Sequence, residues 1–176
     1  MENKEQEPSW HVIYVRHKHE KKVNEALQLC GITSFLPLIK TLVQWKDRKK
    51  KVSKPLFPCY VFVKMISKHD KISISQIQGF VKFLRIGDVL AKVKPSEIIA
   101  IKQLLKIPGA KDFDVLPMKP NRGDALIVDY GPLKGMRCIV ERHLGCDKIF
   151  VKIDSLKYNV SASLPSNYFK PASVGS

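Results

Sequence analysis

The sequence predicts an α+β protein with two domains: an N-terminal α/β sandwich with a mainly antiparallel sheet, and a small C-terminal β-barrel. Strand and helix patterns alternate over the first 107 residues, whereas five short strand patterns follow one another after Arg122. Between these regions, three prolines and a glycine at residues 108–120 are typical of a linker. We therefore expect a disordered leader at 1–8, the sandwich at 9–107, a linker at 108–120, the barrel at 121–171 and a disordered tail at 172–176.

Two strand patterns are expected to form the centre of the N-terminal sheet. Residues Tyr60–Lys64 are aromatic and β-branched, a composition that suits a buried strand. Because Pro55 and Pro58 precede it, its ladder is expected to begin at or after Pro58, with Phe57 at its mouth. Residues Trp10–Arg16 alternate so that both faces are largely apolar, which is typical of a strand in the middle of a sheet.

A third strand, Phe35–Trp45, is expected to pair with Tyr60–Met65 in a long hairpin whose tip is Lys46–Lys54. The stretch from Trp45 to Lys54 holds six cations and one Asp. Lysines on an exposed edge can simply prevent the addition of foreign strands. Their density exceeds what this role needs, and it favours contact with phosphate groups. The residues expected to make that contact are Arg48, Lys49, Lys50 and Lys51.

Three segments carry helical patterns. Residues Lys18–Cys30 have apolar side chains at helical spacing, and Gly31 follows them as a C-cap. The segment Ser67–Gln78 is shorter and also ends at a glycine, and a third helix opens at Pro95 and stops before Pro108. The remaining strand patterns are Phe80–Ile86 in the first domain and, in the barrel, Ala125–Asp129, Met136–Arg142, Lys148–Ile153, Tyr158–Ala162 and Tyr168–Phe169.

The charge distribution predicts a nucleic-acid partner for the N-terminal domain. The chain has a formal net charge of +15, and residues 1–107 hold 21 Lys and Arg against 9 Asp and Glu, a net +12. Such a domain is attracted to phosphates through the release of condensed counterions. No apolar run approaches the ~20 residues needed to span a bilayer, and the first ten residues are unlike a signal peptide. We expect a cytoplasmic monomer without a membrane partner.

Cysteines and histidines give no metal or catalytic signal in the sequence. The four cysteines are widely spaced and form no CxxC pair, so they are expected to be reduced and mostly buried. His17 and His19 are two residues apart, a spacing that points them away from each other on a helix. No nucleophile elbow, phosphate-binding glycine loop or paired-carboxylate motif is present. We therefore expect neither an enzyme nor a cofactor or metal.

Cations crowd the start of the first predicted helix, where the helix dipole is already positive. A bound anion would relieve this repulsion, which amounts to a few tenths of a kcal/mol up to ~1 kcal/mol for each charge. A solvated basic turn, softened by Glu20 and Glu25, explains the pattern equally well. As a hypothesis of base reading, Arg16 could engage a guanine edge and His17 could stack on an unpaired base. The candidate nucleic-acid ligands here are Arg16, His17, Lys21 and Lys22.

Several segments, taken in chain order, resemble the NusG family of transcription elongation factors over about residues 9–171. In that family an N-terminal NGN domain of the α/β sandwich type is joined by a linker to a C-terminal KOW barrel. No single segment is specific, but their order and spacing together are. The segments are Trp10–Arg16 with the basic helix after it, Pro55–Val63, Gly79–Arg85, Val93–Ser96, Gly123–Asp124 and Tyr130–Gly135.

Within the family, the sequence is more similar to operon-specific paralogs, RfaH and the UpxY-type antiterminators, than to housekeeping NusG. The segment Ser53–Pro58 resembles RfaH, and Cys138 stands where NusG-type KOW motifs usually have glycine. Two positions depart from RfaH. Asp70-Lys71-Ile72 falls near its His-Thr-Thr gate-loop triad, and Gln78 occupies the position of an arginine.

The resemblance implies an operon-specific antitermination and processivity factor, serving a surface-polysaccharide locus. Such a factor binds the clamp helices of RNA polymerase, contacts non-template and upstream DNA, and suppresses pausing and termination. A ribosomal protein is a candidate partner of the KOW domain. The polymerase-binding candidates are Tyr14, Phe57, Tyr60, Phe62 and Phe83. For each of them, packing within the core is the alternative role.

Two other functions are compatible with the same sequence features. The first is a general NusG elongation factor, whose KOW domain binds termination or translation factors at all operons. The second, from another class, is a ribosome-associated or RNA-binding KOW protein that does not contact polymerase. The second leaves the Phe57 to Phe62 aromatic cluster without a partner.

Overall fold

The computed structural model describes residues 7–44, 47–117, 125–127, 137–143 and 146–164. The chain divides into two compact units, Met1–Ile98 and Ile99–Ser176. The division falls inside helix α3, Pro95–Leu105, upstream of the predicted linker. Within this helix Ile98, Ile101 and Leu104 are buried and lie three residues apart along one side. None of the helices among the described residues is long and apolar enough to cross a membrane.

The sheet of the first unit is antiparallel and is centred on the two strands predicted for that place. Strand β1, Ser9–Val15, lies between β5, Tyr60–Met65, and β6, Phe80–Phe83. Strand β2, Ser34–Phe35, pairs with the outer side of β5, and β9, Lys92–Val93, pairs with β1. Strand β1 is hydrogen-bonded along both edges, and it is also buried on both faces, with Val12 on one face and Ile13 and Val15 on the other.

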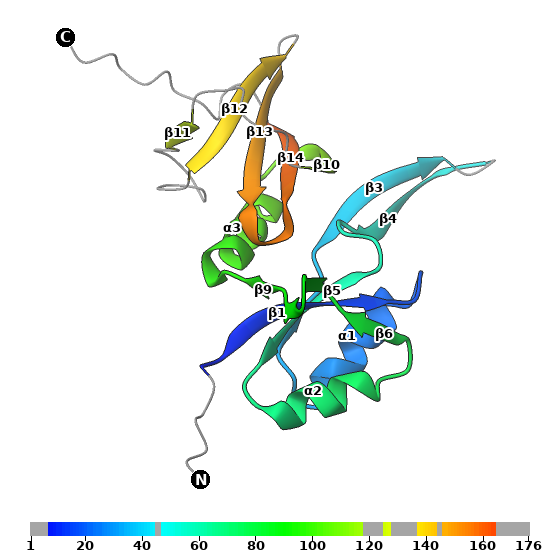
Figure 1. The fold of residues 1–176 in the computed structure, drawn as a ribbon. Helices are drawn as coiled ribbons and strands as arrows, with labels where there is room; N and C mark the ends of the chain where they lie inside the picture. The colour runs from blue at the N-terminus through cyan, green and yellow to red at the C-terminus, as the bar shows by residue number, and fades with distance from the viewer. Residues whose placement is uncertain (1–6, 45–46, 118–124, 128–136, 144–145, 165–176) are drawn as a thin grey trace. The chain divides into compact units, whose positions relative to one another are not determined.

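Two helices cover one face of this sheet (Figure 1). They are α1, Glu20–Leu29, and α2, Lys68–Ser75. Their fully buried residues Val23, Leu27 and Ile74 pack against the odd-numbered side chains of β1 and β5. The even-numbered residues of these strands therefore belong to the opposite face. On the sheet the members of this core are Ile13, Val15, Val61, Val63 and Met65.

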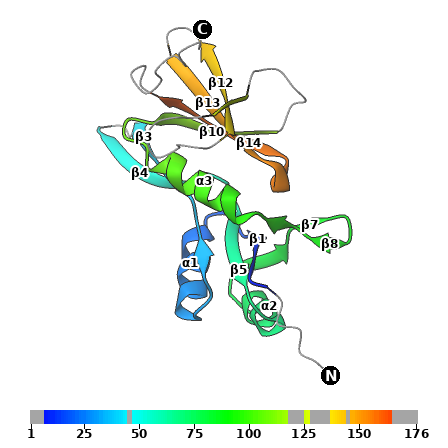
Figure 2. The same ribbon diagram turned by 90° about the vertical axis from the view of Figure 1, so that its left-hand side faces the viewer.

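The basic run is a strand, and this finding corrects the predicted hairpin. Strand β3, Leu38–Gln44, pairs with β4, Lys49–Pro55, from Leu38↔Pro55 to Gln44↔Lys49. Strand β5 pairs with β1 and β2 instead of closing a hairpin with β3. The two strands form a ribbon that extends away from the main sheet in Figures 1 and 2. Lys49–Lys54 thus lie along this ribbon, not in a loop at its tip.

The end of the first sheet also differs from the prediction. The expected strand Phe80–Ile86 is interrupted, because β6 stops at Phe83 and Arg85–Ile86 form a separate strand, β7. Strand β7 pairs with β8, Val89–Leu90, around Gly87, whose positive φ suits the tight turn. This small hairpin stands at one edge of the unit in Figure 2.

The second unit contains an antiparallel sheet, and its first strand falls within the predicted linker. Strand β10, Lys111–Pro117, pairs with β14, Tyr158–Leu164. Alternation of the half-buried Phe113 and Val115 with exposed neighbours supplies the strand pattern that the prolines obscured. The order β10-β14-β13-β12-β11 is completed by β13, Cys146–Ile153, β12, Arg137–His143, and β11, Ala125–Ile127.

The described strands of the second unit account for four of the five predicted barrel strands. They form an open order in which β10 and β11 lie at the two ends, so the closed barrel stays a prediction. A short 3-10 helix, Asp154–Leu156, joins β13 to β14. The fifth predicted strand, Tyr168–Phe169, lies outside the described residues, as do parts of the predicted leader and tail.

Helix α2 begins with a capping box that makes its stability depend on pH. The Asp70 carboxylate accepts the backbone N–H groups of Ile66 at 2.7 Å and Ser67 at 3.0 Å. The Ser67 hydroxyl in turn accepts the Asp70 N–H at 3.2 Å. These bonds, led by the one from Ile66, hold the pKa of Asp70 below its usual value.

Replacing Asp70 by Ala should lower the free energy of unfolding by about 1 kcal/mol at neutral pH. A folded-state pKa below the unfolded value means that the stabilisation is complete above pH 3.8, and that it is lost as the pH falls through the folded pKa. Urea unfolding of both proteins over this range should therefore show the difference shrinking in acid. Asp88→Ala removes an exposed carboxylate and serves as the control. A pH-independent difference would contradict the role of the Asp70 charge.

Candidate functional site

An aromatic cluster lies on the sheet face opposite α1 and α2. Tyr14 of β1 stands directly across from Tyr60 of β5, and their half-buried rings meet edge to face with centroids 5.4 Å apart. Below them the ring of Phe62 packs edge to face on Phe57 at 5.6 Å and also contacts Phe35. We call Tyr14, Phe57, Tyr60 and Phe62 the aromatic face. The structure thus brings together four of the five predicted polymerase ligands.

Three of these side chains pack inside the domain, which is the alternative role given for each of them in the sequence analysis. Phe62 is fully buried, so its ring supports the aromatic face from within and offers no contact surface. Phe83 lies on the other side of the sheet, because it stands across from Ile13 and packs against the core beneath the helices. Phe57 is buried as well, with 4% of its surface exposed. The accessible part of the aromatic face is therefore the Tyr14–Tyr60 pair.

The cations at the start of α1 form an exposed basic turn. Arg16, His17, Lys21 and Lys22 are all exposed, so an anion could reach them. The turn is fixed by the Arg16 N–H, which donates to the Gly79 carbonyl at 2.8 Å. At Gly79, φ is +101°, and a Cβ would lie 2.9 Å from a methyl group of Val23, so only glycine fits there.

The carboxylate expected to soften this turn has a different role. Glu20 is buried, and its Oε1 accepts the backbone N–H of Cys59 at 2.9 Å. It therefore ties the first residue of α1 to the loop before β5. The Cys59 Sγ lies 3.8 Å from Nδ1 of His17, and its hydrogen bond to the Tyr14 hydroxyl raises the pKa of that tyrosine. The basic turn and the aromatic face thus meet at Cys59.

The β3–β4 ribbon carries the second cationic surface. Residues that stand directly across in an antiparallel pair share a face, and the faces alternate along each strand. Lys40 stands across from Ser53, whereas Lys51 and Lys49 are two and four residues before Ser53. Lys40, Lys49 and Lys51 therefore share one face, which we call the cationic face of the ribbon, and all three are exposed.

The other described cations of the ribbon lie outside its cationic face. Lys50 and Lys54 belong to the other face of β4, which also holds the buried Ile39. Arg48 is exposed just before β4 begins. Sequence reasoning missed Lys40, because its alignment with the basic run is visible only from the register of β3 with β4.

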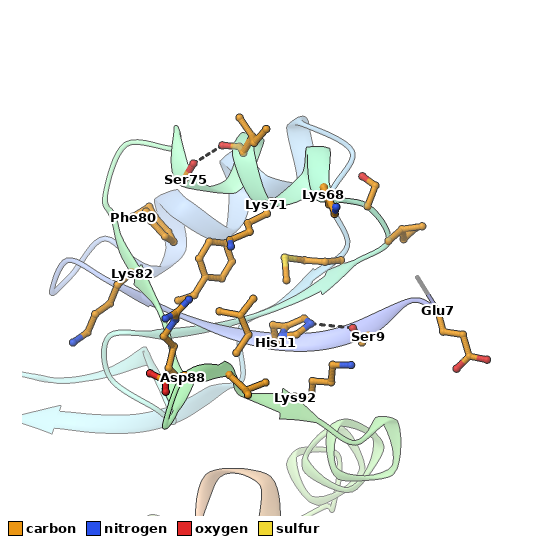
Figure 3. Close-up of a pocket in the computed structure, with 18 residues that line it drawn as sticks. Glu7, Ser9, His11, Lys68, Lys71, Ser75, Phe80, Lys82, Asp88 and Lys92 are labelled. Atoms are coloured by element: carbon orange, nitrogen blue, oxygen red, sulfur yellow. Dashed lines mark hydrogen bonds between the residues drawn. The ribbon is translucent and has the colours of Figure 1, made fainter. Parts of the chain in front are cut away.

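A pocket of about 1100 Å³ lies between the start of β1, helix α2, β6 and the β7–β8 hairpin (Figure 3). Lys68, Lys71, Lys82 and Lys92 line it, and Lys71 lies 6.0 Å from the centroid of the Phe83 ring. The lining residues come from separate parts of the first unit, from Ser9 in β1 to Lys92 in β9, so no local motif could have predicted this pocket. Of the predicted gate-loop positions, Lys71 and Ile72 line the pocket, while Asp70 caps α2.

His11 lies at the base of this pocket as a neutral structural residue. Its Nδ1 donates to the carbonyl of Ala91 at 3.0 Å, and its Nε2 accepts from the Ser9 hydroxyl at 2.9 Å (Figure 3). Burial lowers the pKa of His11 and outweighs the bond to Ala91, while the charge of Lys92 acts in the same direction as burial. The cations of the pocket, rather than this histidine, make it suitable for an anion.

A domain that presents a tyrosine pair next to a basic turn, and a second cationic surface on its ribbon, is suited to bind other macromolecules rather than one small substrate. The sequence matches the family model described as transcription termination factor nusG over residues 8–102, more than half of the chain. The chain belongs to the NusG family of transcription factors.

Two solved structures are similar to this chain. One is described as the domain interaction in Thermotoga maritima NusG. It is 19% identical, covers 90% of this chain and 93% of its own, and has a TM-score of 0.49. The other is the MjSpt4:Spt5 complex in conformation A, which is 14% identical, covers 92% of this chain and 96% of its own, and has a TM-score of 0.31.

Proposed function

We propose that this protein is an operon-specific antitermination and processivity factor that binds the clamp helices of RNA polymerase and suppresses pausing and termination. The observation that carries the proposal is the half-exposed Tyr14–Tyr60 pair, which lies within the part of the chain that matches the family. Tyrosines combine a large apolar area with a hydroxyl group, which makes them frequent anchors of protein interfaces. Polymerase is the partner that membership of this family favours.

In this proposal the two cationic surfaces hold the DNA of the elongation complex. The cationic face of the ribbon contacts upstream duplex through phosphates, which positions the protein without reading sequence. The basic turn meets the non-template strand, where unpaired bases expose edges that a duplex conceals. There Arg16 contacts a guanine edge, His17 stacks on a base and Lys22 holds a neighbouring phosphate. This turn supplies the operon specificity.

The C-terminal part of the chain is proposed to form the KOW barrel, with a ribosomal protein as its candidate partner. The antiparallel sheet that begins at β10 supports this assignment, because four of its strands follow the predicted order. Coupling to a ribosome would protect the transcript from termination while the N-terminal domain stays on polymerase. The target is proposed to be a surface-polysaccharide locus.

Deleting the gene and mapping transcripts across the genome tests the function directly. An operon-specific factor should lose promoter-distal reads in one operon, with promoter-proximal reads unchanged, because only elongation fails. Complementation by the wild-type gene should restore the distal reads. A uniform change at many operons would instead indicate a general elongation factor, and an unchanged transcript profile would contradict a role in transcription.

A further inference from the structure

The junction of the basic turn and the aromatic face contains three side chains that can ligate a metal. His17 lies in the turn before α1, Glu20 opens that helix, and Cys59 lies in the loop before β5. Their candidate ligand atoms all lie within 4.8 Å of one another. The three residues come from two segments about 40 positions apart, so the fold, not the local sequence, brings them together.

We propose that His17, Glu20 and Cys59 form a binding site for a divalent transition-metal ion of the zinc class, with water as the fourth ligand. A thiolate, an imidazole and a carboxylate together favour such an ion over magnesium or calcium, which prefer oxygen ligands alone. Three protein ligands and one open position also match the usual composition of an accessible zinc site. The site is independent of the proposed function in transcription.

The distances are close to those that tetrahedral coordination requires. With zinc bonds of about 2.3 Å to sulfur and 2.0 Å to nitrogen, a tetrahedral site separates the two ligand atoms by about 3.5 Å. The His17 Nδ1 and Cys59 Sγ atoms are 3.8 Å apart. The widest separation in the group, at most 4.8 Å, needs a contraction of up to about 1.3 Å. His17 is exposed, so its ring has room to rotate toward the other two ligands.

The backbone holds the other two ligands in place. Glu20 is buried, and its Oε1 accepts the Cys59 N–H at 2.9 Å, which joins the carboxylate to the loop that carries the thiol. Cys59 itself has φ +65°, and Lys18, next to His17, has φ +64°. A left-handed conformation is strained for any residue other than glycine. Backbone strain of this kind is concentrated at functional sites, and here two strained residues flank the same three side chains.

The surroundings determine what the ion would do. Arg16, Lys18, Lys21 and Lys22 are exposed and direct positive charge at the same turn, which weakens the affinity for any cation but leaves solvent free to screen the repulsion. The thiol must lose its proton on binding, and the ion replaces that proton at the sulfur. A bound ion would fix the ring of His17, which in the free protein is held by the Cys59 Sγ alone among the contacts described for its ring.

The test uses the full chain with Cys30, Cys138 and Cys146 replaced by serine, so that Cys59 is the remaining thiol. Titration with Co²⁺ should give a thiolate-to-metal charge-transfer band that saturates at one ion per chain and is displaced by Zn²⁺. Cys59→Ser should abolish the band, and His17→Ala should weaken Zn²⁺ affinity by about tenfold or more. Because His17 is exposed, His17→Ala should keep the fold. It therefore tests the site even if Glu20→Gln, a change at a buried residue, unfolds the protein.

A matched control separates the site from general thiol chemistry. A chain that keeps Cys30, which is exposed on the far end of α1, and carries Cys59→Ser has one accessible thiol without the histidine and carboxylate. It should give no saturable band. Equal Co²⁺ binding by the Cys30 chain, or Zn²⁺ binding that His17→Ala leaves unchanged in a folded protein, would overturn the proposal. Loss of polymerase binding would not, because that result concerns the proposed function.

Discussion

Replacing Tyr60 by Ala should weaken binding to core RNA polymerase by about 30-fold, which corresponds to ~2 kcal/mol. The side chain is half-buried against Tyr14 and belongs to the accessible part of the aromatic face. Truncation removes one of the two tyrosines and leaves Tyr14 without its edge-to-face partner. The affinity is measured by biolayer interferometry with immobilised polymerase, after circular dichroism has verified the fold of the variant.

Phe83→Ala is the matched control for this experiment. It removes an aromatic ring of similar size, but from the sheet face that packs against α2 and the core. A folded Phe83→Ala protein should therefore bind polymerase nearly as tightly as the wild type. If Tyr60→Ala binds like wild type, or if both variants lose affinity equally while staying folded, the aromatic face is not the polymerase contact.

The second large effect is expected on the cationic face of the ribbon. Each phosphate contact that is lost lowers the slope of log K against log salt concentration by about 0.9 on duplex DNA, so the triple Lys→Ala variant should lose about 2.7. The residues replaced are Lys40, Lys49 and Lys51, which share one exposed face of β3 and β4. The slope is measured from the binding of upstream-fork DNA by the whole protein between low and moderate salt.

Two controls separate local contact from net charge. Lys50→Ala with Lys54→Ala removes exposed cations of the same strand from its other face, and its slope should change little. Replacing Lys94, Lys106 and Lys111 by Ala removes three charges elsewhere, giving the same net +12 from +15 as the triple variant. If this second control lowers the slope as much as the ribbon variant, the ribbon contributes only to the overall charge.

The centre of the first sheet could be predicted because local composition determines it. Residues of β1 and β5 are apolar on both faces, and a strand of that kind has few stable places outside the middle of a sheet. Helices α1 and α3 were predicted for a similar reason, since their apolar residues are spaced along one buried side. The sequence analysis placed Tyr14 and Tyr60 in one candidate surface, and the antiparallel register brings them together: Tyr14, near the C-terminal end of β1, stands across from Tyr60, the first residue of β5.

The ribbon was mispredicted because strand pairing is a long-range property. Little in Lys49–Pro55 favours a strand by composition, yet seven backbone pairings with β3 make it one. The alternation of faces that follows from those pairings places Lys40 on the same face of the ribbon as Lys49 and Lys51. The position of Phe83 could not be predicted for a related reason. The register of a strand decides which face each of its residues occupies, and the register of β6 against β1 shifts between Tyr14 and Val15.

The group of His17, Glu20 and Cys59 could not be predicted at all. The spacing of cysteines and histidines carries information only when the ligands lie on one local motif, and here 39 positions separate Glu20 from Cys59. The left-handed backbone at Cys59 directs its thiol toward the turn, and left-handed conformations at residues other than glycine have little signature in a single sequence.

Strand β10 determines where the second unit can be separated from the first. It forms an outer strand of its sheet and covers one side of β14, from Lys111↔Ser163 to Pro117↔Tyr158. A fragment that starts at residue 121, as the composition alone suggests, would leave the backbone N–H and C=O groups of β14 exposed along seven residues. An unpaired edge of this kind recruits strands from other molecules, so such a fragment would tend to self-associate. A fragment that starts before Lys111 would keep this edge covered.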